Sequence, residues 1–351
     1  MKFTTKLIFF LSTLFLFNCS SEKKKFLQLN GEVKGTDIKS IMLIKPNQDT
    51  RFDSIIQIPV IEGKFYYEEE LQNPEVVNLA FTESVKSGAY RPMPLFLENE
   101  KINLTIFPEE EFDKNTVKGG NLNIKYKNYK KEADSLFNPK DWEKQLKWEQ
   151  EYYIPQNPSL VSYYLFLEQL RYFKENLNLD LIKNNYKKLS ESNQNHPYNE
   201  LALNLISAIE NIKVGKKYTD FSAPDLNGNE IILSDKIKEK VALLDLWATW
   251  CGPCIAKSRT MVPVYNEYKD KGFTIIGVAG EFKNTDRLVK FLEKEKWEWT
   301  NLVELDRQNN IWQKYGVDGG GGIFLIDEDG LILAKDPTAE EVRIELESRL
   351  N

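Results

Sequence analysis

VALLDLWATWCGPC, residues 241–254, is the most informative segment for the fold of the C-terminal part of this sequence. Its first half is an apolar run interrupted only by Asp245, which is typical of a strand buried inside a sheet. The run leads directly into Cys251 and Cys254, spaced Cys-x-x-Cys, and helical periodicity follows from Pro253 to Asp270. The stretch therefore predicts a buried strand that ends at a pair of cysteines at the start of a helix.

The two cysteines are placed for redox chemistry rather than for stapling the fold. A disulfide between them closes a ring of only four residues, which constrains little of the unfolded chain. Backbone N–H groups and the dipole at a helix N-terminus favour an anion, so we expect Cys251 to be the attacking thiolate. Cys254 lies one turn further into the helix, where it resolves a mixed disulfide once its proton is removed.

Asp245 and Trp250 are the other candidate side chains of this stretch. Burial of a lone carboxyl group raises its pKa and suits it to proton transfer near neutral pH, which predicts Asp245 as the base. The alternative is that Asp245 lies at the surface, on an edge strand. Trp250 precedes Cys251 directly, and we expect its indole to shield the reactive sulfur.

Outward from this stretch, residues 214–351 alternate between strand and helix patterns. A βαβ unit followed by a hairpin and a last helix predicts an α/β sandwich with a mixed sheet. The expected strands are Ile231–Leu233, Val241–Leu246, Phe273–Ala279, Ile323–Ile326 and Leu331–Ala334. The expected helices are Pro253–Asp270, Asn284–Glu293 and Ala339–Leu350.

The residues before position 214 predict two further units. Residues 26–118 contain short apolar segments at close spacing, bounded by Gly, Pro and Asn, which is typical of an all-β, sandwich-like domain. Residues 119–213 change to helical spacing, and the aromatic side chains of Ser159–Phe173 are expected to form core rather than a ligand groove. The predicted fold class is therefore multidomain, with an N-terminal all-β domain, a central helical region and a C-terminal α/β domain.

The first 25 residues have the pattern of an export signal. Lys2 and Lys6 precede an apolar run, Leu7–Phe17, which is too short to span a bilayer as a helix. Residues 16–19, Leu-Phe-Asn-Cys, resemble a bacterial lipobox, which implies a signal peptide over residues 1–18, lipidation of Cys19 and a polar tether over residues 19–25. The alternative is an ordinary signal peptide cut elsewhere, with Cys19 discarded.

Composition argues against several classes of function. The chain has 351 residues, 41% of them hydrophobic, which favours a globular protein of two or three domains. The formal net charge of -6 shows no basic excess, so nucleic acid is not an expected partner. The single histidine, His196, lies in a polar turn before Pro197, which argues against a catalytic triad or a histidine-rich zinc site. A structural zinc site normally has four ligands, and there is no second Cys-x-x-Cys.

Residues 214–351 resemble a TlpA/ResA-type thioredoxin-like domain of the redoxin superfamily. The most specific part of the similarity is WATWCGPC, residues 247–254, and the segment with Val214-Gly215 and residues 220–228 resembles the opening hairpin of that family. Residues 26–118, with the helices that follow, also resemble a domain of unknown role that often precedes this module in lipoproteins of Bacteroidota.

The resemblance implies a thiol:disulfide oxidoreductase. In it Cys251 is the nucleophile, Cys254 the resolving thiol and Asp245 the buried acid. The residues that surround the sulfurs are Trp250, Gly252, Pro253 and Gly321. Because the Gly252-Pro253 dipeptide resembles that of reducing thioredoxins, the expected direction is reduction of client disulfides.

Two positions depart from the family pattern. Where the family has a cis-proline that faces the cysteines, shapes the peptide-docking edge and keeps metals off the thiols, this sequence has Gly321, in the run Gly319–Gly322 after Asp318. The glycines predict a flexible loop, with either an altered client surface or a drifted domain of weak or lost activity. Arg259 replaces a proline that kinks the active-site helix in many relatives, and a modest effect is expected.

The sequence thus predicts a membrane-anchored thiol:disulfide oxidoreductase at the cell envelope, facing the periplasm. No cofactor is expected beyond the redox-active disulfide Cys251–Cys254. The expected partners are client proteins with disulfides, a membrane or envelope thiol that supplies electrons, and the membrane itself through a lipid anchor on Cys19.

Three alternatives stay open. The first is a redox-inert binding lipoprotein that keeps the thioredoxin module as a scaffold. The second is a peroxidase of the same superfamily, although those enzymes carry Thr-x-x-Cys, and Thr249 is only two residues from Cys251. The third is a metal or iron–sulfur centre shared by two chains, which the missing proline at Gly321 makes conceivable.

Overall fold

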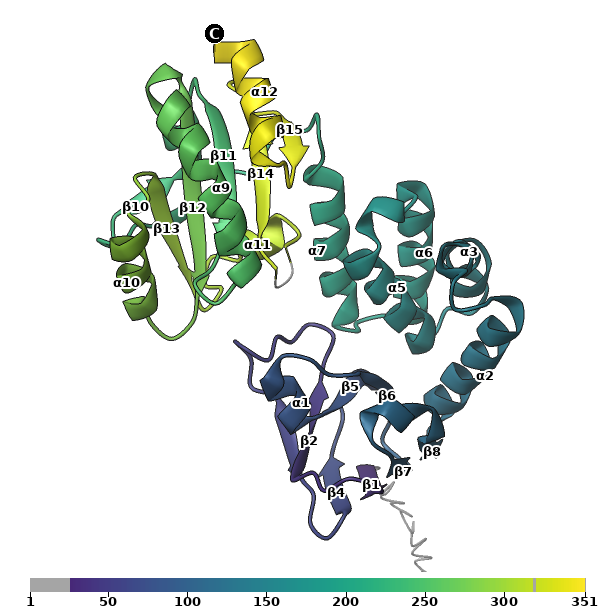
Figure 1. The fold of residues 1–351 in the computed structure, drawn as a ribbon. Helices are drawn as coiled ribbons and strands as arrows, with labels where there is room; N and C mark the ends of the chain where they lie inside the picture. The colour runs from purple at the N-terminus through teal and green to yellow at the C-terminus, as the bar shows by residue number, and fades with distance from the viewer. Residues whose placement is uncertain (1–25, 318–319, 351) are drawn as a thin grey trace, which may run out of the picture.

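The computed structural model describes residues 26–317 and 320–350. Three parts follow one another along the chain: strands coloured purple and blue, helices in teal, and an α/β part in green and yellow (Figure 1). The predicted signal peptide, Cys19 and the tether lie outside the described residues. Within the described ranges, no helix is both long and apolar enough to cross a membrane.

The N-terminal part consists of two four-stranded sheets that share one apolar core. The first sheet has the order β4 (Lys64–Glu69), β1 (Leu27–Val33), β7 (Lys101–Ile106), β8 (Thr116–Lys118). The second has the order β3 (Ile56–Pro59), β2 (Ser40–Ile44), β5 (Glu75–Phe81), β6 (Met93–Leu97). The short helix α1 (Thr82–Ser87) lies between β5 and β6, so this part is β-rich rather than all-β.

The central part is helical and packs onto the second sheet. Its helices are α2 (Asn121–Leu136), α3 (Trp142–Trp148), α4 (Ile154–Gln156), α5 (Leu160–Tyr172), α6 (Leu179–Ser192) and α7 (Tyr198–Asn211). Ten of the thirteen residues of α5 are buried, and Tyr163, Tyr164 and Phe166 confirm the predicted aromatic core, whereas Tyr172 is 70% exposed. His196 is also buried, with Nε2 2.9 Å from the carbonyl oxygen of Pro74, so it joins the helices to the sheet.

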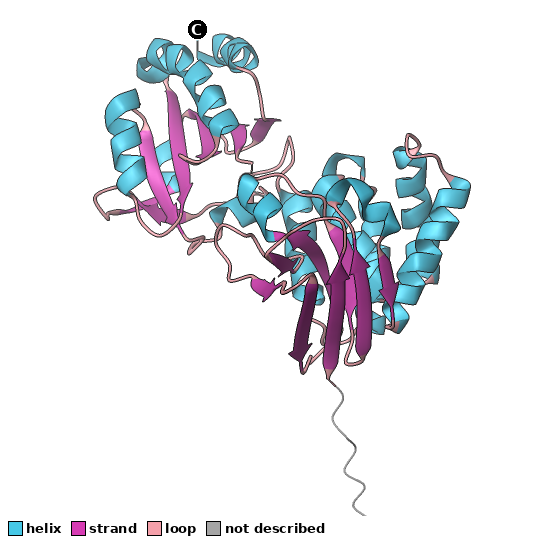
Figure 2. Ribbon diagram, turned by 60° about the horizontal axis from the view of Figure 1, so that its bottom comes forward, coloured by secondary structure: helices cyan, strands magenta, loops and turns pink. Residues whose placement is uncertain are grey.

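The C-terminal part is built on a five-stranded mixed sheet with helices packed around it (Figure 2). The strand order is β13 (Thr300–Leu305), β12 (Phe273–Glu281), β11 (Val241–Trp247), β14 (Gly322–Ile326), β15 (Ile332–Lys335). β11 pairs parallel with β12 and antiparallel with β14. A small hairpin, β9 (Ser222–Pro224) and β10 (Glu230–Ile232), precedes the sheet, and α8 (Leu233–Ile237) follows the hairpin. This arrangement confirms the predicted thioredoxin-like fold.

Three longer helices accompany this sheet: α9 (Gly252–Tyr268), α10 (Asp286–Glu295) and α12 (Ala339–Leu350). Strand β13 and the short helix α11 (Ile311–Lys314) are absent from the sequence prediction. β13 has Thr300, Asn301 and Glu304 as three of its six residues, so it lacks a clear strand pattern.

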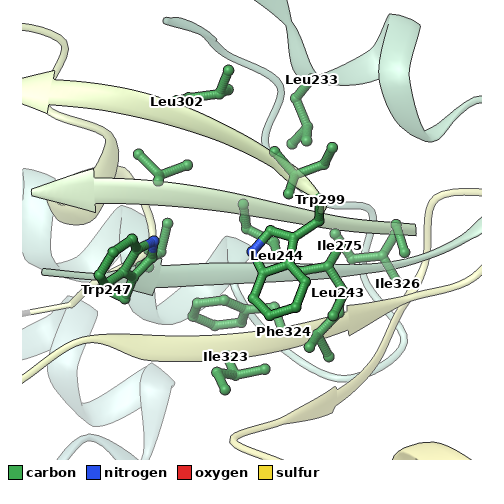
Figure 3. Close-up of a cluster of buried hydrophobic side chains, with 14 of the residues drawn as sticks. Leu233, Leu243, Leu244, Trp247, Ile275, Trp299, Leu302, Ile323, Phe324 and Ile326 are labelled. Atoms are coloured by element: carbon green, nitrogen blue, oxygen red, sulfur yellow. The ribbon is translucent and has the colours of Figure 1, made fainter. Parts of the chain in front are cut away.

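The core of the sheet explains why β11 occupies its centre. All seven residues of β11 are buried, because helices and loops cover both faces. Figure 3 shows Leu243, Leu244 and Trp247 of this strand packed with side chains of the neighbouring strands, including Ile275 and Phe324. The site therefore follows a fully buried strand at the centre of the sheet.

Candidate active site

Cys251 and Cys254 form a disulfide at the N-terminus of α9, with Cα atoms 5.3 Å apart. Cys251 is the residue that caps the helix, and its sulfur accepts a hydrogen bond from the backbone N–H of Cys254 at 3.3 Å. Gly252 and Pro253 form the first turn, where proline needs no hydrogen-bond partner. Only 7% of Cys251 and 8% of Cys254 is exposed. A thiolate at Cys251 is therefore held where helix N–H groups stabilise negative charge.

Asp245 lies on the central strand β11 and is 2% exposed, so the alternative of an edge-strand surface position does not hold. Its nearest polar partner is Ser258, whose hydroxyl donates to Oδ2 at 2.6 Å. Burial raises the pKa of Asp245 to about 7, and the Ser258 hydrogen bond and the charge of Lys257 only partly oppose this rise. The carboxyl group therefore exchanges its proton near neutral pH.

Ser258 is a site residue that the sequence analysis did not identify. Its Oγ lies 2.6 Å from Asp245 Oδ2 and 3.0 Å from the carbonyl oxygen of Cys254. A hydroxyl group has one hydrogen, so Ser258 donates to ionised Asp245, or accepts from protonated Asp245 and donates to the Cys254 carbonyl. The hydroxyl thus joins the buried acid to the turn that carries the resolving cysteine.

The spacing of the buried residues along α9 could have identified Ser258 as a residue that faces the sheet. The buried residues of this helix are Cys254, Ser258, Met261, Val264 and Tyr268, at intervals of three or four. A serine in that series faces the sheet, and Asp245 is the polar group that the preceding strand supplies there.

Gly321 faces the sulfur pair, as the resemblance implies. A Cβ atom on Gly321 would lie 2.5 Å from Cys254 Sγ and 2.6 Å from the carbonyl oxygen of Leu246, and its φ is +67°. The carbonyl oxygen of Gly320 lies 3.2 Å from Cys254 Sγ and 3.8 Å from Cys251 Sγ. No peptide bond among the described residues is cis.

These contacts change the interpretation of the glycine run. The prediction of a flexible loop falls partly on Asp318 and Gly319, which lie outside the described residues. At Gly321, glycine is required because both the positive φ and the sulfur contact exclude a side chain. Glycine therefore lets the backbone itself approach Cys254, at the place where the family pattern has a proline ring.

Trp250 lies at the other border of the disulfide and is half-buried. Its indole Nε1 donates to the carbonyl oxygen of Gly280 at 2.9 Å, and its ring packs beside Trp312 with centroids 6.0 Å apart. The guanidinium of Arg51, from the N-terminal part, lies 4.0 Å from the centre of the indole ring. The predicted shield is thus itself covered by a residue about 200 positions earlier in the chain.

Glu281 is a second residue that the sequence analysis missed. It is 3% exposed, and its carboxylate accepts from the backbone N–H of Thr249 at 2.7 Å and from the Thr249 hydroxyl at 2.8 Å. Arg287 donates to the carbonyl oxygen of Thr249 at 2.9 Å. These bonds anchor the segment before Cys251 to the end of β12. Glu281 could have been found as the one charged residue of β12, at the C-terminal end of a largely apolar strand.

Arg259 lies on the exposed side of α9, away from the sulfurs. Its guanidinium donates twice to Glu295, at 2.9 Å from Nε and 2.7 Å from the terminal nitrogen, and so joins α9 to α10. The helix contains its proline at Pro263 instead. The modest effect expected of Arg259 stays a prediction.

Comparison with known proteins agrees with this geometry. Residues 214–335 match the AhpC/TSA family, and residues 27–126 match a domain of unknown function (DUF4369). The thiol-disulfide oxidoreductase ResA of Bacillus thuringiensis subsp. konkukian is 34% identical over 141 residues, which cover 40% of this chain and 79% of that protein. The thiol:disulfide interchange protein DsbE of Pseudomonas fluorescens biotype C is 32% identical over 127 residues, or 35% of this chain and 65% of that protein.

Among solved structures, the thioredoxin domain of the thiol-disulfide oxidoreductase BVU-2223 from Bacteroides vulgatus is similar to 40% of this chain. The match covers 99% of that domain at 30% identity, with a TM-score of 0.36 for the comparison. Through its AhpC/TSA region, the chain belongs to the thioredoxin-fold family of the ResA thiol-disulfide oxidoreductases.

Proposed function

We propose that this protein reduces disulfides in client proteins through the dithiol form of Cys251 and Cys254. The observation that carries the proposal is the geometry of the pair: a disulfide at a helix N-terminus, one helical turn from a hydroxyl that contacts buried Asp245. The names of the relatives, ResA and DsbE, support the same reaction class.

The reaction begins with reduced protein. The Cys251 thiolate attacks one sulfur of the client disulfide, and the electron pair of the broken S–S bond goes to the other client sulfur, which takes up a proton. The Cys254 thiol then loses its proton and attacks Cys251 Sγ. The client sulfur that was bonded to Cys251 leaves as a thiol, and the Cys251–Cys254 disulfide remains. In total, two electrons pass to the client, which also gains two protons, one released by Cys254 and one from solvent, because Cys251 reacts as the thiolate.

Asp245 is proposed as the acceptor of the Cys254 proton. Its raised pKa of about 7 means that ionised and protonated forms are both populated near neutral pH. Ser258 provides the hydrogen-bonded contact between Asp245 and the Cys254 turn. Gly320 presents its carbonyl oxygen to Cys254 Sγ, where a thiol donates in the reduced protein.

The cellular setting is proposed from the sequence pattern. We propose an exported, lipid-anchored protein, attached through Cys19 and facing the periplasm, whose dithiol is restored by a membrane or envelope thiol. No cofactor beyond the cysteine pair takes part in the proposed reaction. Replacing Cys19 with serine should release the protein from the membrane fraction. Retention of Cys19→Ser on membranes would contradict the anchor.

A trapping experiment tests the redox function. The full chain, as wild type, Cys251→Ser and Cys254→Ser, is reduced, freed of reductant and mixed with insulin as a protein disulfide. We expect wild type to generate insulin thiols, Cys254→Ser to accumulate a covalent adduct through Cys251, and Cys251→Ser to do neither. If reduced wild type leaves insulin oxidised, the binding lipoprotein becomes the better account.

The reduction potential of the pair then tests the direction of the reaction. A reducing couple, near that of thioredoxin, is expected for a protein that donates electrons to clients. A strongly oxidising couple would reverse the proposed direction.

A further inference from the structure

The loop between β2 and β3, residues 45–55, joins the N-terminal part to the active-site edge of the thioredoxin part. We refer to it as the β2–β3 loop. Arg51 places its guanidinium carbon 4.0 Å from the centre of the Trp250 ring. Phe52 meets Phe282, which directly follows β12, with ring centroids 6.0 Å apart and perpendicular planes.

The Asp49 carboxylate binds one arginine of the N-terminal part and one of the thioredoxin part. Its carboxylate accepts from Arg51 Nε and from the Arg51 backbone N–H, each at 2.9 Å. It also pairs with Arg307 of the thioredoxin part at 2.7 Å. The Arg307 guanidinium lies 4.4 Å from the centre of the Phe52 ring and 3.7 Å from Asp53 Oδ2. One carboxylate thus binds an arginine from each part of the chain.

The charge on Asp49 persists at neutral pH. Partial burial raises its pKa, but hydrogen bonds and charge from Arg51, together with the charge of Arg307, outweigh burial, and the pKa of Asp49 lies below its ordinary value. Ionised Asp49 keeps both guanidinium groups oriented, because bidentate carboxylate–guanidinium pairs are geometrically specific.

The loop occupies one of the two borders of the disulfide. Cys251 is bordered by Trp250, which precedes it, and by the Gly320 carbonyl, 3.8 Å from its sulfur. Because only 7% of Cys251 is exposed, the residues beside it limit how a client reaches the sulfur. Arg51 covers the Trp250 side.

We propose that the β2–β3 loop is a size-selecting wall of the client site: docked on Trp250, it admits small disulfides and extended peptide segments to Cys251 and holds back bulky folded ones. This inference rests on the proposed function for the identity of the clients. The access that it describes can be measured on the thiol alone.

The test compares alkylation of Cys251 by a small and a large reagent of the same chemistry. The full chain with Cys19→Ser and Cys254→Ser leaves Cys251 as its one thiol, since the sequence has three cysteines. N-ethylmaleimide and a 5-kDa polyethylene glycol maleimide are the two probes. We expect Arg51→Ala to raise the rate with the large reagent about tenfold, in keeping with loss of a partly buried cation–π contact. The rate with N-ethylmaleimide should change less than about twofold, because a small reagent reaches Cys251 in the parent protein while the Arg51 contact is intact.

Asp49→Asn is a second variant, which loosens both arginines without shortening the loop, and it should act in the same direction. Arg91→Ala is the matched control. Arg91 also pairs with an aspartate, Asp113, and lies 5.8 Å from the ring centre of Phe112, but these contacts stay inside the N-terminal part. Its rates with both reagents should equal those of the parent.

Equal acceleration with both reagents, or no change with the large one, in Arg51→Ala and Asp49→Asn would overturn the inference. Insulin reduction by the same substitutions in the otherwise native chain is measured separately. Failure of wild type in that assay counts against the proposed function, whereas the alkylation ratio reports on the loop in either case.

Discussion

Asp49 of the N-terminal part and Asp245 of the thioredoxin part are both withdrawn from water, yet their pKa values move in opposite directions. Burial acts on both in the same sense, because it disfavours the charged form. Asp49 has two arginines beside it, and its pKa falls. Asp245 has a hydroxyl as its hydrogen-bond partner, and its pKa rises to about 7. Burial and partners together decide whether a carboxylate serves as a fixed charge or as a proton acceptor: Asp49 is half-buried between two arginines, and Asp245 is fully buried beside a hydroxyl.

Asp245→Asn removes the proposed proton acceptor, and we expect it to slow the reaction more than any other substitution discussed below. Loss of a general base should slow the resolving step at least about a hundredfold at pH 7 while leaving the first attack by Cys251 intact. Rapid mixing of reduced protein with a chromogenic disulfide separates the two steps. Asp235→Asn removes an exposed carboxylate of the same part as a control. Equal slowing of both steps would contradict a role confined to Cys254.

The stability of the same variant has a defined sign with pH. The folded-state pKa of Asp245 is raised from 3.8 to about 7, so the carboxyl group favours the folded state below pH 3.8, and this contribution is lost as pH rises through 7. The loss is on the order of 4 kcal/mol. Asp245→Asn should therefore gain stability relative to wild type between pH 4 and pH 8 in urea unfolding. A constant difference across that range would contradict the raised pKa.

Gly321→Ala tests the backbone approach to the sulfurs. An alanine there combines a left-handed φ with crowding of Cys254 Sγ, so it should destabilise the oxidised protein by about 3 kcal/mol and make the couple more oxidising. Gly320→Ala is the matched control, because its Cβ would meet no atom within 4 Å. Gly31→Ala in β1 crowds the Phe65 ring and should lower stability without changing the reduction potential. An unchanged potential in Gly321→Ala would refute the sulfur contact.

Ser258→Ala removes the hydroxyl that donates a hydrogen bond to Asp245. The Ser258 hydrogen bond lowers the pKa of Asp245, so its loss should raise that pKa further and shift the pH–rate profile of the resolving step to higher pH. A rate loss of about tenfold at pH 7 is expected, in line with a hydrogen bond to a charged group. Ser348→Ala, which removes an exposed serine hydroxyl that donates to the carbonyl oxygen of Glu345 in α12, should have no effect. A uniform rate loss without a pH shift would indicate a purely structural role.

Asp49→Asn has the smallest expected effect, on the other side of the comparison. The pairs of Asp49 are partly exposed, so the cost should stay below about 1 kcal/mol at pH 7. Because the pKa of Asp49 is lowered, its contribution is present above the ordinary aspartate range and is lost as pH falls through the lower folded-state value. Thermal unfolding at pH 7 and pH 3 measures the difference, which should shrink at pH 3. A larger cost at pH 3 would contradict the lowered pKa.

Local pattern was enough to predict the elements that carry the cysteines. β11 and α9 follow from an apolar run and a helical period that are continuous in sequence, and the strand-rich character of residues 26–118 follows from similar short runs. β13 and α11 escaped prediction because their residues are selected by what they pack against: Glu304 accepts the backbone N–H groups of Ile311 and Trp312. A charged residue has low strand propensity, so a short segment that contains one is predicted as a loop when the groups that bind the charge are not known.

The reactive groups could be identified from local sequence: two cysteines one turn apart at a helix start, after a strand with a single acid. That information is local, because spacing along one strand and one helix sets which atoms can meet. The surroundings of the sulfurs depend on contacts between residues that are distant in sequence. Gly321 reaches Cys254 because β14 pairs with β11 in the sheet. Arg51 reaches Trp250 because the β2–β3 loop docks across the two parts, a contact between distant residues that no local pattern encodes.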